Sequence, residues 1–221
     1  MARYKPAADD IYETENGFYL LSHPSRLAKL LAHYELYQMI AGLPGAVVEL
    51  GVYKGASLMR FATFRGVLEN DHARAIYGFD AFGAFPRGEV AGDADKAFIE
   101  RFEAAGGDGI AREDLEALIA AKGFANISLI EGNVFDTVPA FLADKPAEKI
   151  ALMHLDMDVY EPTAFAIEQM IDRMVPGGLV VFDDYGMVEG ATRAADEMCE
   201  RHDLAMEKLH HYAIPAFAVA R

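Results

Sequence analysis

The chain of 221 residues has a single cysteine, Cys199, and no tryptophan. One cysteine excludes an intramolecular disulfide, and a protein without disulfides fits the reducing cytoplasm. No apolar run approaches the length of about 20 residues that a transmembrane helix needs. The basic N-terminal residues are not followed by the apolar segment of a signal peptide. We therefore predict a cytoplasmic protein that does not enter the membrane.

Basic side chains are also few. The chain has 20 lysines and arginines and 35 acidic residues, which gives a formal net charge of −15 at pH 7. A surface of this sign repels nucleic acids and anionic membranes, so neither is expected as a partner. A phosphorylated small molecule is not excluded, because a bound cation and local basic residues can reverse the field at one site.

The length predicts a single domain over residues 1–221. We expect an N-terminal arm and helix over residues 1–42 and an α/β core over residues 43–221. The first twenty residues show no periodicity and predict an irregular arm, whereas apolar residues at helical spacing predict a helix from Arg26 to Ala41. The strands and helices that then alternate predict an α/β fold with a doubly wound, mostly parallel sheet and right-handed crossovers.

The predicted elements alternate along the rest of the chain. The predicted strands are Val47–Leu50, Ala75–Asp80, Ile127–Ile130, Ile150–Leu155 and Leu179–Phe182, with a closing pair at Asp203–Leu209 and Ile214–Ala220. The predicted helices are Gly55–Leu68, Arg112–Lys122 and Thr163–Met174, with others that end near Ala143 and Arg201. Residues 81–109 are too long for a plain connection and predict a functional loop with a short helix inside. Pro176-Gly177-Gly178 is expected to end the preceding helix.

Acidic clusters follow two of the apolar strands. The run Ile150–Leu155 leads into Asp156-Met157-Asp158, and Leu179–Phe182 leads into Asp183-Asp184. Such runs are typical of strands buried on both faces of a parallel sheet, where ligands bind beyond the carboxyl ends. Up to four carboxylates would share one crevice, and a hard divalent cation with oxygen ligands resolves their repulsion most simply. The clusters therefore predict metal-assisted chemistry.

The loop after the first predicted strand contains two glycines. It reads Glu49-Leu50-Gly51-Val52-Tyr53-Lys54-Gly55-Ala56-Ser57, which matches neither the dinucleotide fingerprint nor the P-loop. Two glycines nevertheless let the backbone turn sharply and approach a ligand. The second strand ends in Asp80, where a carboxylate can bind ribose hydroxyls, and the third runs into Glu131-Gly132-Asn133. The three features together favour a ribose-containing cofactor over three unrelated turns.

These motifs resemble those of a known family. The order E-L-G-x-x-x-G-x-S, G-F-D, E-G-N and P-G-G before an apolar strand resembles a class I S-adenosylmethionine-dependent methyltransferase. The motifs H-L-D-M-D-V-Y and V-F-D-D-Y-G resemble the macrocin O-methyltransferase family, from about Phe18 to Ala218. The resemblance implies a Rossmann-like, seven-stranded sheet with an N-terminal helical arm, and a homodimer or larger assembly. It also implies methylation of sugar hydroxyls in natural-product or surface-polysaccharide pathways.

The resemblance assigns roles to individual residues. Asp156, Asp183 and Asp184 would bind Mg²⁺ or another divalent cation. Asp158 would be the general base, with Asp156 beside it as a second catalytic residue. The residues expected to contact S-adenosylmethionine are Glu49, Gly51, Tyr53, Gly55, Ser57, Asp80, Phe82, Gly132, Asn133 and Asp156. The N-terminal arm is short for the family, so the identity of the acceptor does not carry over.

Several other residues allow two interpretations. His154 lies inside a buried strand and is predicted to be a hydrogen-bonded core histidine, while His210 and His211 are second-tier candidates for touching substrate. Four N-terminal aromatic residues suit a lid over the acceptor and ordinary packing equally well: Tyr4, Tyr12, Phe18 and Tyr19. Phe82, Phe85 and Pro86 suit a wall of the cofactor or substrate site and ordinary packing equally well.

Three alternative functions stay open. A catechol-type O-methyltransferase uses the same fold and a similar metal. Asp156-Met157-Asp158 is a D-x-D motif, which would hold a metal and a nucleotide sugar in a glycosyltransferase. A non-catalytic binding module is disfavoured, because holding unpaired carboxylates together destabilises a fold. The glycine loop and Asp80 favour S-adenosylmethionine, and the expected acceptor is a small-molecule sugar, either nucleotide-linked or part of a glycosylated metabolite or polysaccharide precursor.

Overall fold

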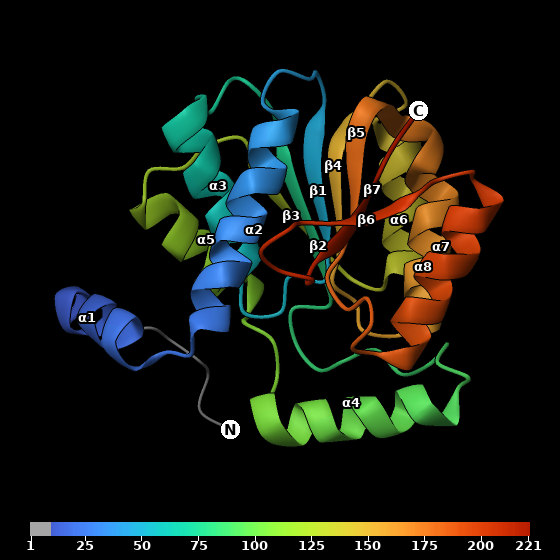
Figure 1. The fold of residues 1–221 in the computed structure, drawn as a ribbon, viewed down its shortest axis with the longest axis horizontal. Coiled ribbons are helices and arrows are strands. Elements are labelled where there is room, and N and C mark those ends of the chain that lie inside the picture. Colours follow the sequence, from blue (N-terminus) through green and yellow to red (C-terminus); the bar gives the residue numbers. More distant parts are fainter. Residues whose placement is uncertain (1–9) are drawn as a thin grey trace.

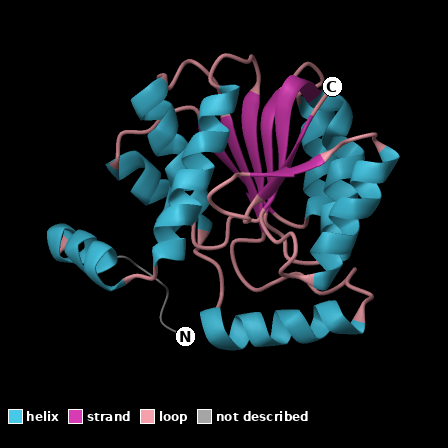
Figure 2. Ribbon diagram, in the orientation of Figure 1, coloured by secondary structure: helices cyan, strands magenta, loops and turns pink. Residues whose placement is uncertain are grey.

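The computed structural model describes residues 10–221. They form a seven-stranded sheet with the order β3-β2-β1-β4-β5-β7-β6 and with helices on both faces (Figures 1 and 2). Strands β1 to β5 are parallel, and β7 and β6 close one edge as an antiparallel pair. The predicted doubly wound sheet is therefore confirmed. The strands are β1 (Ala46–Leu50), β2 (Ile76–Asp80), β3 (Ile127–Glu131), β4 (Ile150–Leu155), β5 (Met174–Phe182), β6 (Met206–Lys208) and β7 (Ala216–Val219).

The helices form one layer on each face of the sheet. Figure 1 shows α2, α3 and α5 on one side and α6, α7 and α8 on the other. Each layer covers its own apolar cluster, because successive strand side chains such as Val47 and Val48 point to opposite faces. The helices are α1 (Ile11–Leu21), α2 (Pro24–Ile40), α3 (Ala56–Leu68), α4 (Asp93–Gly106), α5 (Arg112–Ala121), α6 (Val134–Asp144), α7 (Tyr160–Met170) and α8 (Glu189–Arg201).

The chain reverses its direction of travel across the sheet between β1 and β4. Strand β1 has β2 on one side and β4 on the other, and every residue of β1 and β4 is buried. In open α/β sheets the crevice at such a switch point, outside the carboxyl ends of the strands, is where ligands bind. The glycine loop follows β1 and the first acidic cluster follows β4, so both lie at this point.

Helix α4 lies across the carboxyl ends of the strands (Figure 1). Its 14 residues lie within the segment that the sequence predicts as a functional loop with a short helix. Its buried Ile99 packs against Val90 and Val159, and its buried Asp95 accepts a hydrogen bond of 3.0 Å from the backbone N–H of Tyr160. These contacts fix α4 as one wall of the crevice.

Two predictions about the elements are wrong. Residues 11–21 form helix α1 rather than an irregular arm, and none of the side chains of α1 is buried. A helix without a buried face needs no apolar stripe, so its sequence has no periodicity to read. Pro176-Gly177-Gly178 lies inside β5 instead of ending a helix. The register with β4 shifts across these residues, and the Gly177 N–H donates to the Ala220 carbonyl at 2.8 Å, so they form an irregularity within the strand and not a helix end.

Among residues 10–221, no helix is both long and apolar enough to cross a membrane.

Candidate active site

The loop between β1 and α3 runs directly against the end of β4. Gly51 has a φ of +92°, and a Cβ built on it would lie 1.9 Å from the carbonyl oxygen of Asp156. The Asp156 N–H in turn donates to the Leu50 carbonyl at 2.9 Å. Only glycine fits a crossing this close with a positive φ. The loop and the acidic end of β4 are therefore held as one unit.

Gly51→Ala is expected to destabilise the fold more than Gly123→Ala does, and to abolish turnover. Both glycines have a positive φ, +92° and +70°, which disfavours an L side chain by about 1–2 kcal/mol. Only Gly51 adds a collision with backbone, since nothing lies within 4 Å of a Cβ at position 123. Chemical denaturation measures both losses of unfolding free energy. Equal losses would mean that Asp156 moves out of the way at no cost.

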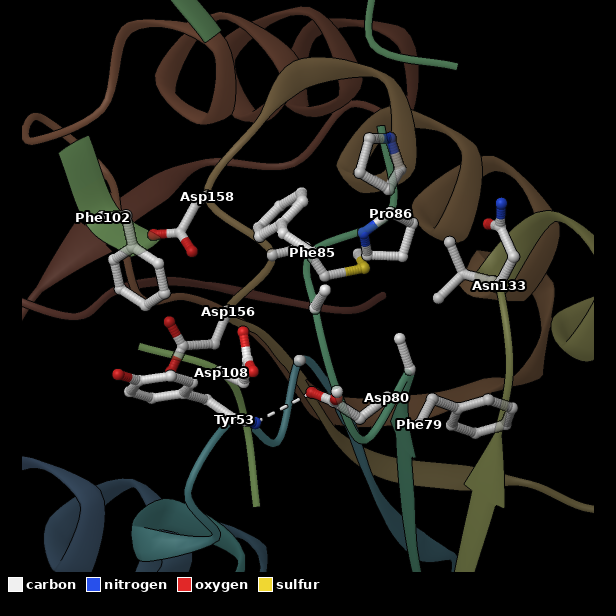
Figure 3. A pocket seen from close by; sticks show the side chains of 18 of the residues that line it. Tyr53, Phe79, Asp80, Phe85, Pro86, Phe102, Asp108, Asn133, Asp156 and Asp158 are labelled. Atoms are coloured by element: carbon white, nitrogen blue, oxygen red, sulfur yellow. Dashed lines mark hydrogen bonds between the residues drawn. The ribbon is translucent and has the colours of Figure 1, made fainter. Parts of the chain in front are cut away.

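Asp80, at the end of β2, holds the glycine loop in place. Its Oδ2 accepts hydrogen bonds from the backbone N–H groups of Val52 and Tyr53, both at 2.8 Å, and its Oδ1 accepts one from Phe82 at 2.6 Å. The bond to Tyr53 is drawn in Figure 3. A carboxylate oxygen can accept two hydrogen bonds, so Oδ1 keeps capacity for a hydroxyl donor. Asp80 thus suits both the shaping of the loop and the predicted contact to ribose.

Asp80→Ala is expected to weaken the binding of S-adenosylhomocysteine by about 1–3 kcal/mol, the usual effect of losing hydrogen bonds to a charged group. Calorimetric titration measures the affinity. Asp93→Ala is the matched control, because Asp93 is a fully exposed acid in the first turn of α4. If Asp80→Ala binds as tightly as the control, the ribose does not lie at Asp80.

A pocket opens between the glycine loop, α4 and the ends of β2, β3 and β4 (Figure 3). It encloses about 820 Å³ of empty space, including open solvent at its mouth. Its walls include aromatic and apolar side chains: Tyr53, Phe79, Phe85, Pro86, Phe102, Phe135 and Met157. Asp80 lies toward the β2 end and Asp156 and Asp158 lie at the β4 end, so one pocket joins the predicted cofactor residues to the predicted base.

Most of the residues predicted to contact the cofactor line this pocket. They are Gly51, Tyr53, Asp80, Gly132, Asn133 and Asp156. Four others are not brought to it. Glu49 is fully buried in the central strand β1, where it faces His154. Gly55 packs against Leu115, and Ser57 and Phe82 are buried. Strand alternation explains Glu49, which shares the α2-facing side of β1 with Val47.

Several other pocket residues are not marked by any sequence pattern. Phe102 and Glu103 come from α4, and Asp108 and Gly109 come from the segment after it. They reach the pocket only because α4 crosses the end of the sheet, which no local pattern encodes. Phe85 and Pro86 do line the pocket, as one of their two interpretations predicts.

Three carboxylates gather at the ends of β4 and β5. Asp156, Asp158 and Asp184 each offer an oxygen within 4.8 Å of the others. The Asp158 N–H donates to Oδ2 of Asp184 at 3.1 Å, which ties the two strand ends together. Asp158 has a φ of +65°, an unusual conformation of the kind that concentrates at functional sites.

These three acids have raised pKa values. Burial, and then the charge of Asp156, raises the pKa of Asp158 to about 8. Burial and neighbouring carboxylates raise the pKa of Asp156 and of Asp184 as well. Carboxylates in this arrangement either share protons or require a cation.

Asp183 faces away from this cluster toward α2. Its Oδ2 accepts a hydrogen bond of 2.5 Å from Lys29 Nζ, and its Oδ1 lies 3.3 Å from His154 Nε2 and 3.5 Å from His33 Nε2. Burial alone would raise the pKa of Asp183, but the hydrogen bond with His154, the nearby His33 ring and the charges of His154 and Lys29 hold it well below its usual range. Asp183 is therefore an ionised carboxylate with three partners.

His154 is a buried, hydrogen-bonded histidine, as the sequence predicts. Its Nδ1 lies 3.0 Å from Oε1 of Glu49, and its Nε2 faces Asp183. Burial lowers its pKa, but hydrogen bonds to the two carboxylates outweigh this and raise the pKa to about 10. His154 is thus an imidazolium that links the β1 acid to the β5 acid behind the pocket.

The donor set of this cluster fits a hard divalent cation. Three carboxylates from two adjacent strand ends supply the oxygen ligands that Mg²⁺ and Mn²⁺ prefer. Burial and then the neighbouring carboxylates raise their pKa values, and a bound cation would offset the repulsion among them. Two of the three predicted ligands, Asp156 and Asp184, belong to the cluster. The third, Asp183, is paired with Lys29 instead, and Asp158 is the third carboxylate of the cluster.

Other candidate residues lie elsewhere. His210 and His211 gather with Glu35, with His211 Nδ1 3.6 Å from Glu35 Oε2, and neither histidine lines the pocket. Tyr12 and Tyr19 on α1 are largely exposed and do not cover the pocket, while Tyr4 lies outside the described residues. Cys199 is buried in α8.

Comparison with known proteins places this architecture among methyltransferases. Residues 22–214 match the family described as macrocin O-methyltransferase (TylF). The chain is 32% identical over 152 residues to the 8-demethyl-8-(2,3-dimethoxy-alpha-L-rhamnosyl)-tetracenomycin-C 4'-O-methyltransferase of Streptomyces olivaceus. The matched region covers 66% of this chain and 55% of the relative. It is 28% identical over 177 residues to the mycinamicin III 3''-O-methyltransferase of Micromonospora griseorubida, covering 75% and 65%. The chain thus spans between about half and two thirds of the length of these curated relatives.

A solved structure shares the fold over nearly the whole chain. The apo structure of CalS11, a TDP-rhamnose 3'-O-methyltransferase of calicheamicin biosynthesis, superimposes with a TM-score of 0.70 at 28% sequence identity. The similarity covers 96% of this chain and 88% of that one.

Proposed function

Because the chain belongs to the macrocin O-methyltransferase family, we propose that it transfers a methyl group from S-adenosylmethionine to a hydroxyl group of a sugar. One observation carries this proposal: the same pocket extends from the glycine loop and Asp80 to Asp158. A cofactor held at the loop and an acceptor held at the acids would meet within it. The acceptors named for the similar proteins, a rhamnosylated metabolite and TDP-rhamnose, favour a deoxysugar that is nucleotide-linked or part of a glycosylated metabolite.

Positioning is the main contribution of the pocket. The apolar and aromatic walls exclude water, and the loop shaped by Asp80 and Gly51 fixes the cofactor against the end of β4. Placing an acceptor oxygen in line with the methyl group converts a bimolecular reaction into a step between oriented groups. Helix α4 contributes Phe102 and Glu103 to the pocket and would restrict the way in.

Asp158 is the residue we propose as the proton acceptor. It lines the pocket, and its raised pKa makes it a stronger base than an ordinary carboxylate. A sugar hydroxyl is nevertheless a very weak acid, so a carboxylate alone removes its proton poorly. A divalent cation held by Asp156 and Asp184 would supply positive charge that lowers the pKa of the hydroxyl. Asp158 then accepts the proton as the new C–O bond forms.

A panel of acceptors tests the proposal. Purified protein is incubated with S-adenosylmethionine and either nucleotide-linked deoxysugars or catechols, with and without Mg²⁺, and release of S-adenosylhomocysteine is measured. We expect release with at least one deoxysugar and with no catechol. Release with catechols alone would instead support the catechol-type enzyme.

The glycosyltransferase alternative is tested by binding. The D-x-D motif of Asp156 and Asp158 would then hold a nucleotide sugar through a metal, and S-adenosylhomocysteine would not bind. Copurification or calorimetric binding of S-adenosylhomocysteine removes this alternative. Transfer of the sugar itself, without methylation, would establish it.

A further inference from the structure

An ammonium group from outside the α/β core reaches the acidic end of β5. Lys29 lies on α2, and its Nζ donates to Oδ2 of Asp183 at 2.5 Å. The Lys29 side chain is 25% exposed and that of Asp183 only 4%. Asp183 directly precedes Asp184 in the sequence, so the pair lies next to the carboxylate cluster on its α2 side, with the lysine partly exposed and the carboxylate buried.

Lys29 lies within the field of several acids. The charges of Asp183, Asp156 and Asp184 all attract its ammonium group. The ammonium thus interacts with each acid that the family resemblance assigns to the metal. It is a cation of this chain at the place where a metal cation is expected.

Both oxygens of Asp183 already have positively charged or histidine partners in this arrangement. Lys29 occupies Oδ2, while His154 and His33 face Oδ1. A divalent cation at contact distance from Oδ2 would lie next to the ammonium group, and two positive charges that close repel strongly. The contact of Asp183 with Lys29 and the binding of a metal at Oδ2 therefore oppose each other.

We propose that Lys29 competes with the divalent cation for Asp183, so that metal binding through Asp183 displaces the lysine and Lys29 sets the metal affinity of the site. The inference rests on the metal site of the proposed function. Without metal, Lys29 neutralises part of the buried negative charge and stabilises the fold. With metal, Asp183 joins Asp156 and Asp184, and the ammonium group moves toward solvent.

The test is calorimetric titration of Mg²⁺ and Mn²⁺ into the full chain without cofactor or acceptor. Lys29→Met is expected to lower the metal Kd by about 10-fold or more, because it removes a competing charge-assisted hydrogen bond. Lys29→Arg keeps a competing cation, so its Kd should stay near the wild-type value. If Lys29→Met does not fold, Lys29→Gln removes the charge while keeping a polar side chain.

Arg60→Met is the matched control for charge alone. Arg60 on α3 also feels the charges of Asp183 and Asp156, but Asp183 takes its close contacts from Lys29, His33 and His154 instead. Losing this more distant positive charge should change the metal Kd by less than about 3-fold, since longer-range pairs near the surface are weak. An equal gain in both variants would show a general charge effect and overturn the competition.

Thermal unfolding gives an independent readout. Without metal, Lys29→Met should have a lower Tm than the wild type, because buried carboxylates lose a compensating charge. Saturating Mg²⁺ should then raise the Tm of Lys29→Met by more than that of the wild type.

The outcomes separate this proposal from the proposed function. If the wild type binds metal and Lys29→Met binds it with an unchanged or higher Kd, the competition is wrong and the metal site stands. If neither protein binds Mg²⁺ or Mn²⁺, both the competition and the metal requirement are wrong.

Discussion

Asp158→Asn is expected to lower kcat by about 10²–10⁴, the range that general acid–base catalysis usually contributes. Asparagine keeps the shape of the side chain and tolerates the positive φ of +65° at this position, so the fold should be retained. The backbone bond from residue 158 to Asp184 also stays. The loss would therefore report on the carboxylate itself. Single-turnover kinetics with saturating S-adenosylmethionine measure it.

Two controls accompany this variant. S-adenosylhomocysteine should bind to Asp158→Asn with nearly wild-type affinity, and excess Mg²⁺ should not restore turnover. Because the structure places Asp158 with Asp156 and Asp184, recovery of activity at high Mg²⁺ would make Asp158 a metal ligand and not the base. Near-normal turnover at all metal concentrations would remove Asp158 from the mechanism.

Removing divalent metal is expected to abolish turnover, and adding Mg²⁺ is expected to restore it. Asp156, Asp158 and Asp184 each offer an oxygen within 4.8 Å of the others, and like charges this close are unfavourable without a cation or shared protons. Activity is measured after exhaustive chelation and again during titration with Mg²⁺. Full activity in the chelated protein would end the metal hypothesis.

Variants of the ligands sharpen this prediction. Asp156→Asn and Asp184→Asn should each raise the Mg²⁺ concentration needed for half-maximal activity by about 10–100-fold, a typical effect of weakening a metal site. Excess metal should rescue them in part. Asp93→Asn, at a fully exposed position on α4, should leave the Mg²⁺ requirement unchanged.

The central strands of the sheet could be predicted because their burial leaves a clear apolar pattern in the sequence. β1 and β4 are buried throughout, so their sequences are apolar apart from Glu49 and His154, and glycine or acidic residues follow their carboxyl ends. Parallel strands bring these ends to one edge, so the meeting of Gly51, Asp80 and Asp156 around one pocket follows from the pattern alone. Their roles toward cofactor and metal stay predictions.

The different directions of Asp183 and Asp184 were missed, although the sequence holds a signal. Adjacent residues on a strand point to opposite faces. Val181 belongs to the apolar cluster beneath α2, and Asp183, one residue beyond the end of β5, faces α2 as well. Lys29 and His33 are four residues apart on α2, and hence on one face of that helix. Reading the two periodicities together would have placed the lysine and the histidine against Asp183.

Helices α1 and α4 show what local patterns do not encode. Helix α1 has no buried side chain, so nothing in its sequence reflects tertiary contact. The contribution of α4 to the pocket depends on how it crosses the sheet, through contacts such as that of Asp95 with the backbone of Tyr160. Such long-range placements follow from the whole fold and not from any single segment.

The most direct test of the account follows a deuterium-labelled methyl group from S-adenosylmethionine to the acceptor. Wild-type protein with Mg²⁺ and a nucleotide-linked deoxysugar should place the label on one sugar oxygen and release an equal amount of S-adenosylhomocysteine. Asp158→Asn should do so far more slowly under the same conditions. Failure to bind S-adenosylhomocysteine, or label that appears on catechols and on no sugar, would contradict the account.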